Sequence, residues 1–275
     1  MNIGNDIKNK YVEEQRKTDG LSTFIVEKAP SLSGATNTKM AMELYFAEQA
    51  GLSLRQVKIV MNNGAVKTES GALYYFCGHI KSETKIGGVG GLFKKAISAG
   101  LTNESLVKPV YTGTGEIVLE PSFKHYILIE LSNEEIIVDK GLFFCCSNKV
   151  EIGSSMQKNV SSTLLGGEGM FQLSLKGSGI VVLELNVPES EIIKYDLKGG
   201  MELKVDGSFV IARTSNIKFS VTKSDKSFIN SAINGEGLLN TFTGEGTVWL
   251  APTEPIYKKM MYSGLPTNNN NMNNK

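Results

Sequence analysis

Few residues in this chain have strong chemistry of their own: two histidines, His79 and His125, and three cysteines, Cys77, Cys145 and Cys146. Cys77 and His79 are two residues apart, which places them on one face of a strand but supplies only half of a zinc site. Neither histidine belongs to an H-x-x-H or H-E-x-x-H pattern, and no G-x-S-x-G nucleophile motif occurs. The sequence therefore predicts no catalytic residue and no metal ligand.

Paired glycines are the next candidates, because glycine-rich loops can hold phosphates. Three pairs open with Gly113, Gly177 and Gly244, and each lacks the third glycine of a G-x-G-x-x-G dinucleotide loop. No G-x-x-x-x-G-K-[ST] loop occurs either. Since strand-like sequence follows each pair directly, we predict turns that need positive φ or close backbone approach, and no cofactor.

Carboxylates recur beside glycines, as Glu168 and Glu236 in one motif and Asp139 and Asp206 in another. Val89 stands in the first copy where Glu168 and Glu236 stand in the others, which argues against a repeated active centre. Turn and edge roles are the favoured interpretation of these acids.

The candidate interaction or turn positions are six residues of two glycine motifs together with the single tryptophan: Gly167, Glu168, Gly169, Gly235, Glu236, Gly237 and Trp249. The tryptophan alternates with Val248 and Leu250 in strand-like sequence. Packing in a core or an interface is therefore favoured over the stacking of a ligand.

These motifs occur three times in the same order. GGVGGLF, GGEGMF and NGEGLL begin at 87, 166 and 234, and TGTGEIVLEP, KGSGIVVLEL and TGEGTVWLAP follow them. The second blocks are 64 and 67 residues apart, counted from Gly113, Gly177 and Gly244. The pattern predicts three tandem units, over about 57–121, 122–188 and 189–255, packed around a shared core with approximate threefold symmetry.

Inside the units the apolar residues alternate with a period of two, as at 57, 59 and 61, which predicts half-buried strands. Continuous apolar runs such as 126–129 and 180–183 predict strands that are covered on both faces. A helix is predicted over 38–51, with Thr38 and Gly51 as caps, and a second short helix from 90.

The expected layout has three parts. Residues 1–36 form an N-terminal lead-in segment, and 37–255 form a single all-β domain of three repeats with one or two short helices. Residues 256–275 form a polar, Asn-rich tail that is expected to be disordered, because it has almost nothing to bury.

Composition limits the partners and the location. The net charge is +1, so the charge balance gives no reason to expect a nucleic-acid partner. No apolar run reaches the length of a membrane span, and the first twenty residues do not resemble a signal peptide. The odd number of cysteines is unlike a secreted disulfide framework, so a cytoplasmic location is predicted.

A family resemblance rests on longer segments. LLGGEGMFQLSLKGSG, VDGSFVIAR and INGEGLLNTFTGEGTVWLAP resemble the altered inheritance of mitochondria protein 24 family. AGLSLRQVKIVMNNGAVKTESGALYYF and VKPVYTGTGEIVLEPSF resemble its form in Gram-positive bacteria, and together the likeness covers about 40–252. The resemblance implies a β-sandwich or prism related to the tryptophan RNA-binding attenuation protein, with pseudo-threefold symmetry and no catalytic residues.

The leading functional hypothesis is a non-catalytic oligomeric scaffold or interaction protein. Its expected partners are copies of itself and an unidentified protein, and family analogy adds peripheral association with a membrane. The alternative is a ligand- or RNA-binding module of attenuator-like fold. An enzyme would require a deep pocket that joins Cys77, His79 or His125 to a carboxylate.

Overall fold

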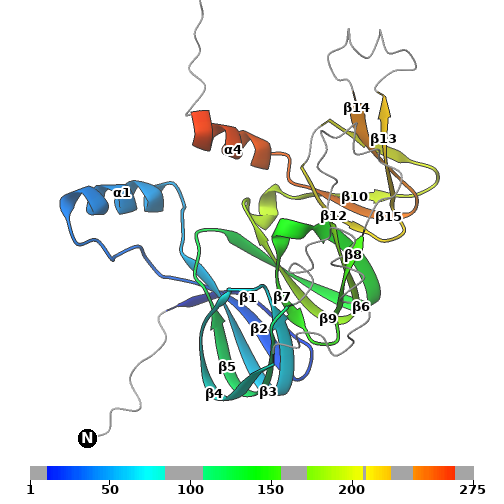
Figure 1. Cartoon of the computed structure of the whole chain (residues 1–275). Helices are drawn as coiled ribbons and strands as arrows, with labels where there is room; N and C mark the ends of the chain where they lie inside the picture. The colour runs from blue at the N-terminus through cyan, green and yellow to red at the C-terminus, as the bar shows by residue number, and fades with distance from the viewer. Residues whose placement is uncertain (1–10, 84–107, 156–171, 207–208, 224–237, 264–275) are drawn as a thin grey trace, which may run out of the picture. The chain divides into compact units, whose positions relative to one another are not determined.

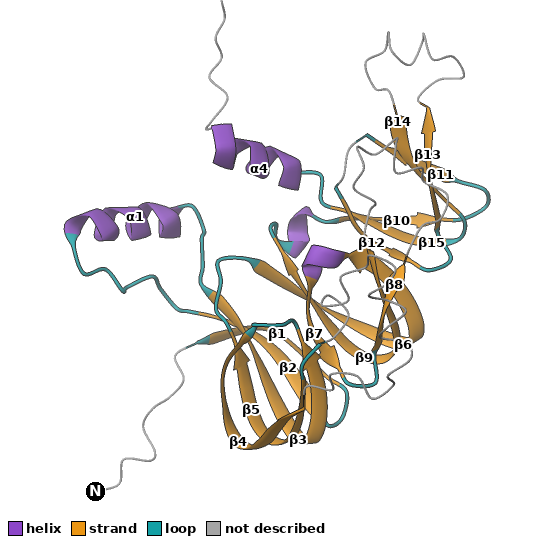
Figure 2. Ribbon diagram, viewed as in Figure 1, coloured by secondary structure: helices purple, strands orange, loops and turns teal. Residues whose placement is uncertain are grey.

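The computed structural model describes residues 11–83, 108–155, 172–206, 209–223 and 238–263 (Figure 1). Strands dominate these residues, every strand pairing is antiparallel, and two α-helices are described (Figure 2). The mostly β class predicted from the sequence is therefore confirmed. The chain divides into two compact units, the first from β1 to β9 and the second from η3 to α4.

The elements of the first unit follow in chain order: β1 (Val12–Thr18), β2 (Ser22–Lys28), α1 (Thr38–Gln49), β3 (Arg55–Thr68), β4 (Leu73–Glu83), β5 (Val110–Leu119), β6 (His125–Asp139), η2 (Lys140–Leu142), β7 (Phe143–Ser147), β8 (Glu151–Ser155) and β9 (Gln172–Leu185). Strand β3 organises this unit, because β2 and then β7 pair along one edge and β5 pairs along the other. The order is β1-β2-β3-β7-β9-β6, with β4 joined through β5 and β8 joined through β9.

The core of the first unit follows the predicted periodicity. Val57, Ile59 and Met61 of β3 are buried, whereas Val60 between them is 43% exposed. The run 180–183 is buried at every position, as expected for a strand covered on both faces. Both strand patterns read from the sequence are thus confirmed in this unit.

Two glycines of β5 bring it very close to β4. Gly113 and Gly115 have φ of +136° and +149°. A Cβ on Gly113 would lie 2.0 Å from the carbonyl oxygen of His79, and one on Gly115 would lie 2.2 Å from that of Cys77. Positive φ and close approach are therefore confirmed, but the predicted turn is wrong, because the pair lies inside a paired strand.

A bulge on β3 faces this glycine pair. The register of β3 against β5 shifts between Met61 and Gly64, and Asn63 has φ of +51°. The Asn63 N–H donates to Thr114 Oγ1 at 2.9 Å. A left-handed residue in a bulge strengthens the local twist, which the glycines opposite accommodate.

The N-terminal strands extend the sheet. Residues 1–36 were expected to be a lead-in segment, yet β1 and β2 add two strands to β3. The side chain of Gln15 joins β1 to β6: its Nε2 donates to the Tyr126 carbonyl at 2.8 Å, and its Oε1 accepts from the Leu128 N–H at 3.3 Å. The Gln15 side chain thereby makes one donated and one accepted hydrogen bond to the β6 backbone, as the backbone of a paired strand would.

Helix α1 forms where predicted, but its N-terminal cap differs. Asn37 is the cap, not Thr38, and its Oδ1 accepts from the Met40 N–H at 2.9 Å. No residue of α1 is buried, and Met42, Tyr45 and Phe46 are about 60% exposed. The second predicted helix, from 90, lies outside the described residues.

The second unit contains the following elements: η3 (Glu189–Glu191), β10 (Ile193–Leu197), β11 (Glu202–Val205), β12 (Val210–Thr214), β13 (Lys218–Lys223), β14 (Leu238–Thr243), β15 (Gly246–Leu250) and α4 (Glu254–Ser263). Strand β15 pairs with β10 and β12, and β14 pairs with β11 and β13. Phe219 and Phe242 are buried with their ring centroids 5.2 Å apart. These rings form an aromatic centre for β13 and β14.

Helix α4 begins two residues before the predicted polar tail, so the expectation of disorder from residue 256 is wrong for 256–263. Polar contacts explain why this segment is ordered. Asn186 donates to Glu254 at 2.7 Å, and the Tyr257 hydroxyl donates to Glu191 at 3.0 Å. Among the described helices, none has the length and apolar character needed to cross a membrane.

Candidate functional site

Six of the seven predicted positions, in the motifs at 167–169 and 235–237, lie outside the described residues. Trp249 is the exception, and it lies in β15 between Lys194 of β10 and Ala212 of β12. The Lys194 ammonium is 4.6 Å from the centroid of the half-buried indole ring. The structure thus places Trp249 in a packed sheet with a cation on its face.

The cysteine and histidine residues do not come together. Cys77 and His79 are exposed on β4, whereas Cys145 and Cys146 are fully buried in β7. In the part of the chain that the structure describes, no group of three His, Cys, Asp or Glu residues could hold a metal ion. The half-site formed by Cys77 and His79 is not completed there.

The three thiols are expected to differ in reactivity. Burial raises the pKa of Cys145 well above its usual value and that of Cys146 to about 12. At pH 8 a disulfide reagent should therefore titrate one thiol rapidly in the folded protein and all three in denaturant, because the thiolate is the reactive form. Cys77→Ser should abolish the rapid phase, and rapid labelling of Cys145 or Cys146 would contradict the burial of β7.

A cavity in the first unit has a volume of about 880 Å³. Its wall comes from four places in the chain: the turn 69–72 between β3 and β4, Lys108 before β5, residues 120–122 after β5, and the region 139–144 around η2. Glu184 of β9 completes the lining. Strand ends and their connections, not strand faces, therefore form this site.

Lys108 is the central cation of the cavity. Its side chain is only 4% exposed, and its ammonium lies 2.5 and 2.7 Å from the two carboxylate oxygens of Glu69. The same ammonium is 5.3 Å from the centroid of the buried Phe143 ring. A buried amine is here stabilised by a carboxylate and an aromatic face together.

A second polar cluster supports Glu184 at the cavity wall. Glu184 accepts hydrogen bonds from Ser122 at 3.2 Å and from the Tyr126 hydroxyl at 3.2 Å, and Lys124 pairs with it at 2.7 Å. Burial, followed by the charge of Glu184, raises the pKa of Tyr126. The tyrosine therefore stays a neutral hydrogen-bond donor at any physiological pH.

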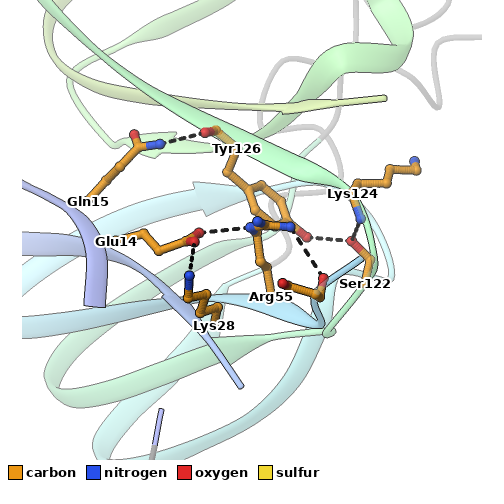
Figure 3. A network of polar contacts seen from close by, with 8 residues as sticks. Glu14, Gln15, Lys28, Arg55, Ser122, Lys124 and Tyr126 are labelled. Carbon is orange, nitrogen blue, oxygen red and sulfur yellow. Dashed lines mark hydrogen bonds and ion pairs between the residues drawn. The ribbon is translucent and has the colours of Figure 1, made fainter. Parts of the chain in front are cut away.

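The cavity wall is anchored to the N-terminal strands (Figure 3). Arg55 and Ser122 exchange two backbone hydrogen bonds of 2.8 and 2.9 Å. Figure 3 shows the Arg55 side chain reaching Glu14, which also pairs with Lys28, at N–O distances of 2.8 and 3.3 Å. These ion pairs fix the position at which β5 leads into β6.

Strand β4 forms a different kind of candidate site. Among the described strands it pairs only with β5, so its other edge has no described partner. Tyr74, Tyr75 and Phe76 are 61, 48 and 43% exposed, and Cys77 beside them is exposed too. Exposed aromatic residues on a long edge strand are a common basis for association between chains.

Sequence reasoning did not identify the cavity. Lys108 belongs to no repeated motif, and it lies 39 residues from its partner Glu69. The cavity contains none of Cys77, His79 and His125, the residues that an enzymatic pocket was expected to use. Asp139 does line it, and its side chain also accepts from the Gly141 N–H at 3.1 Å, in the turn role predicted for it.

Comparison with known proteins adds family information. The sequence model of the family described as "Mitochondrial biogenesis AIM24" matches residues 47–253. An uncharacterised protein of Streptococcus pyogenes serotype M6 is 24% identical over 197 residues, which are 69% of this chain and 77% of that protein. The match to the family model begins after β1 and β2, so it does not include Gln15 or Glu14.

A crystal structure of a Streptococcus pyogenes protein is similar in fold. It superposes with a TM-score of 0.54 and covers 77% of this chain and 94% of its own. The two sequences are 21% identical, so the similarity concerns the fold alone.

Proposed function

The chain belongs to the family described as mitochondrial biogenesis AIM24, and from that premise we propose that it is a non-catalytic, homo-oligomeric scaffold protein of the cytoplasm. The three cysteines are free, which is consistent with a reducing compartment. The single observation that carries the scaffold proposal is the exposed edge of β4.

A repeated architecture is part of the proposal. The β5 glycine geometry recurs at Gly179 of β9, where φ is +145° and a Cβ would lie 2.6 Å from the Ser147 side chain. It recurs again at Gly246 of β15, where φ is +147° and a Cβ would lie 2.0 Å from Thr214 Oγ1. This recurrence supports three tandem units over about 57–121, 122–188 and 189–255, with an approximate threefold relation between them.

The bulge opposite the glycines recurs as well. Asn133 of β6 has φ of +60°, and its N–H donates to Ser178 Oγ at 2.9 Å. Asn63 of β3 donates to Thr114 in the same way in the first tandem repeat. Positive φ is uncommon for residues other than glycine, and both asparagines donate to a hydroxyl group of the facing strand. They support the assignment of β3 with β5, and of β6 with β9, to equivalent repeats.

Strand β4 suits pairing with a second copy of itself. From Leu73 to Ser82 it carries one lysine, Lys81, and no carboxylate. An antiparallel pair centred on Gly78 would place Phe76 opposite Ile80 and Lys81 opposite Tyr75, with no like charges opposed. Such a pair would bury the aromatic row and satisfy the open backbone edge.

The proposal is tested by native mass spectrometry and light scattering of the full chain. We expect the wild type to form oligomers, and Phe76→Lys to weaken the association by about 100-fold, because charged residues block strand edges. Phe123→Lys is the matched control, since Phe123 is 44% exposed and outside β4. A wild type that stays monomeric at high concentration, or equal effects of the two variants, would overturn the proposal.

The cavity favours a second candidate function, the binding of a small ligand. Its volume lies within the range of about 300–1,000 Å³ that is usual for small-molecule pockets. Strand pairing at β4 would use different residues, so both functions can belong to one protein.

A further inference from the structure

Cys77 and His79 share one face of the edge strand β4. Phe76 pairs with Ile117, which belongs to the buried core cluster, so Phe76 lies on the core face of the sheet. Cys77 and His79 alternate with it along the strand and therefore lie on the opposite face, where both are exposed. A thiol and an imidazole, two of the usual zinc ligands, are thus about 6.8 Å apart along one strand face.

The backbone of β4 determines the register in which a second copy can pair. A Cβ on Gly115 would lie 2.2 Å from the carbonyl oxygen of Cys77. A Cβ on Gly113 would lie 2.0 Å from that of His79, so both carbonyl groups point toward β5. Backbone groups alternate between the two edges of a strand, so the N–H and C=O of Gly78 point to the edge that has no described partner. This glycine is therefore a suitable centre for the antiparallel pair proposed for the homo-oligomer.

In that register, Cys77 of each copy lies opposite His79 of the other. Because Gly78 makes the hydrogen bonds at the centre, these flanking pairs are of the non-hydrogen-bonded kind, with Cα atoms only about 4.5 Å apart. The twofold axis generates both pairs at once. Two thiols and two imidazoles then stand at the corners of a rectangle of about 4.5 by 6.8 Å, on one face of the paired strands. A tetrahedral zinc site needs sulfur at about 2.3 Å and nitrogen at about 2.0–2.1 Å, which side chains converging from these corners can supply.

Two simpler arrangements of these residues are excluded. Within the described part of one chain, no three His, Cys, Asp or Glu residues are grouped so that they could hold a metal ion, so the site is incomplete without a second copy. A disulfide between the two Cys77 residues does not fit either. They lie on a diagonal of about 7–8 Å, whereas the Cα atoms of a disulfide are about 4.4–6.8 Å apart. A shared metal ion spans this diagonal, and two thiolates neutralise the charge of Zn²⁺.

We propose that two copies of the chain bind one zinc ion between their β4 strands, through Cys77 and His79 of each copy. The inference rests on the proposed oligomer and adds a metal to its interface. Glu116 lies opposite Cys77 in β5, on the same face and diagonal to His79. Its carboxylate is placed to accept the second ring N–H of the histidine, a common support for a zinc-bound imidazole.

Titration of the chelator-treated full chain with zinc, followed by native mass spectrometry, tests the proposal. We expect one zinc ion for every two chains, and the visible spectrum of a tetrahedral thiolate site when cobalt replaces zinc. Cys77→Ser and His79→Gln should each weaken zinc binding by at least about 100-fold, because each removes two of the four ligands. His125→Gln is the matched control. It removes the other histidine, which pairs with Leu185 at the start of β6, and should bind zinc as the wild type does.

The exposed thiol provides a second readout. Cys77 is the exposed cysteine, and a thiolate that is bound to zinc is not free to attack a disulfide reagent. Zinc should therefore suppress the rapid phase of thiol titration, and a chelator should restore it. Magnesium at the same concentration should leave the rapid phase unchanged, because magnesium prefers oxygen ligands. Rapid labelling of Cys77 at saturating zinc would overturn the inference.

Light scattering with and without zinc separates this inference from the scaffold proposal. An oligomer that forms in chelator and binds no zinc would overturn the inference and leave the scaffold proposal standing. A chain that is monomeric in both conditions would overturn both. The inference also fails if zinc binds to one chain alone, if Phe76→Lys keeps the wild-type zinc affinity, or if His125→Gln loses as much affinity as His79→Gln.

Discussion

Gly115→Ala is expected to destabilise the first unit by about 3–5 kcal/mol. The new Cβ would lie 2.2 Å from the Cys77 carbonyl oxygen and 2.9 Å from the Gly78 Cα, both of which are backbone atoms. A backbone contact cannot be relieved by a rotamer change, so β4 and β5 would have to separate. The φ of +149° adds conformational strain for any residue with a side chain.

Alanine substitutions at two other glycines distinguish the cost of a steric clash from the cost of backbone strain. Gly71 also has positive φ, at +81°, but a Cβ there would meet nothing within 4 Å, so Gly71→Ala should cost only about 1 kcal/mol. Gly153 has no positive φ, and its nearest contact would be Ser174 Cβ at 3.8 Å, so Gly153→Ala should be almost neutral. Urea unfolding of the three variants measures the series, and equal midpoints for Gly115→Ala and Gly71→Ala would contradict the close approach of β4 and β5.

Lys58→Met is expected to lower the free energy of unfolding by about 3 kcal/mol. The Glu27 carboxylate is 5% exposed and forms an ion pair with the Lys58 ammonium, and Gln56 donates to it at 3.0 Å. Removing the lysine leaves a buried carboxylate without its principal countercharge, which costs more than the net value of the pair. Denaturant unfolding monitored by far-UV circular dichroism measures the loss.

Two further variants test whether the loss of stability in Lys58→Met comes from the buried charge of Glu27. Adding Glu27→Gln to Lys58→Met should restore most of the stability, because a neutral amide can be buried beside Gln56 at lower cost. Lys39→Met removes a lysine from the exposed pair with Glu43, at 3.9 Å on α1, and should change stability by less than about 0.5 kcal/mol. A double variant as unstable as Lys58→Met alone would show that the lysine acts through packing.

The features that the sequence predicted are those set by neighbours in the chain. Alternation at 57, 59 and 61 identified β3, because a strand with one buried face needs a period of two. Paired glycines such as Gly113 and Gly115 indicated positive φ, because only glycine adopts it without cost. Helix α1 was predicted over 38–51 and forms over Thr38–Gln49, although the capping residue was displaced by one position.

The features that were missed depend on contacts between distant segments. The strand β1 carries Glu14 and Gln15, whose partners Arg55 and Tyr126 lie 41 and 111 residues away. Local sequence contains no signal for such pairing, so residues 1–36 resembled a polar lead-in. The cavity could not be predicted from the sequence either. Its lining comes from five separate segments of the chain, which are brought together only by the pairing of the strands.

The Gln15 contact also has a consequence for biosynthesis. Strand β1 leaves the ribosome early, but its partner on β6 follows 111 residues later. At about 5–20 residues per second, this separation corresponds to roughly 6–22 seconds of translation. During that interval the edge of β1 that later contacts β6 stays open, although β2 already has β1 and β3 as partners.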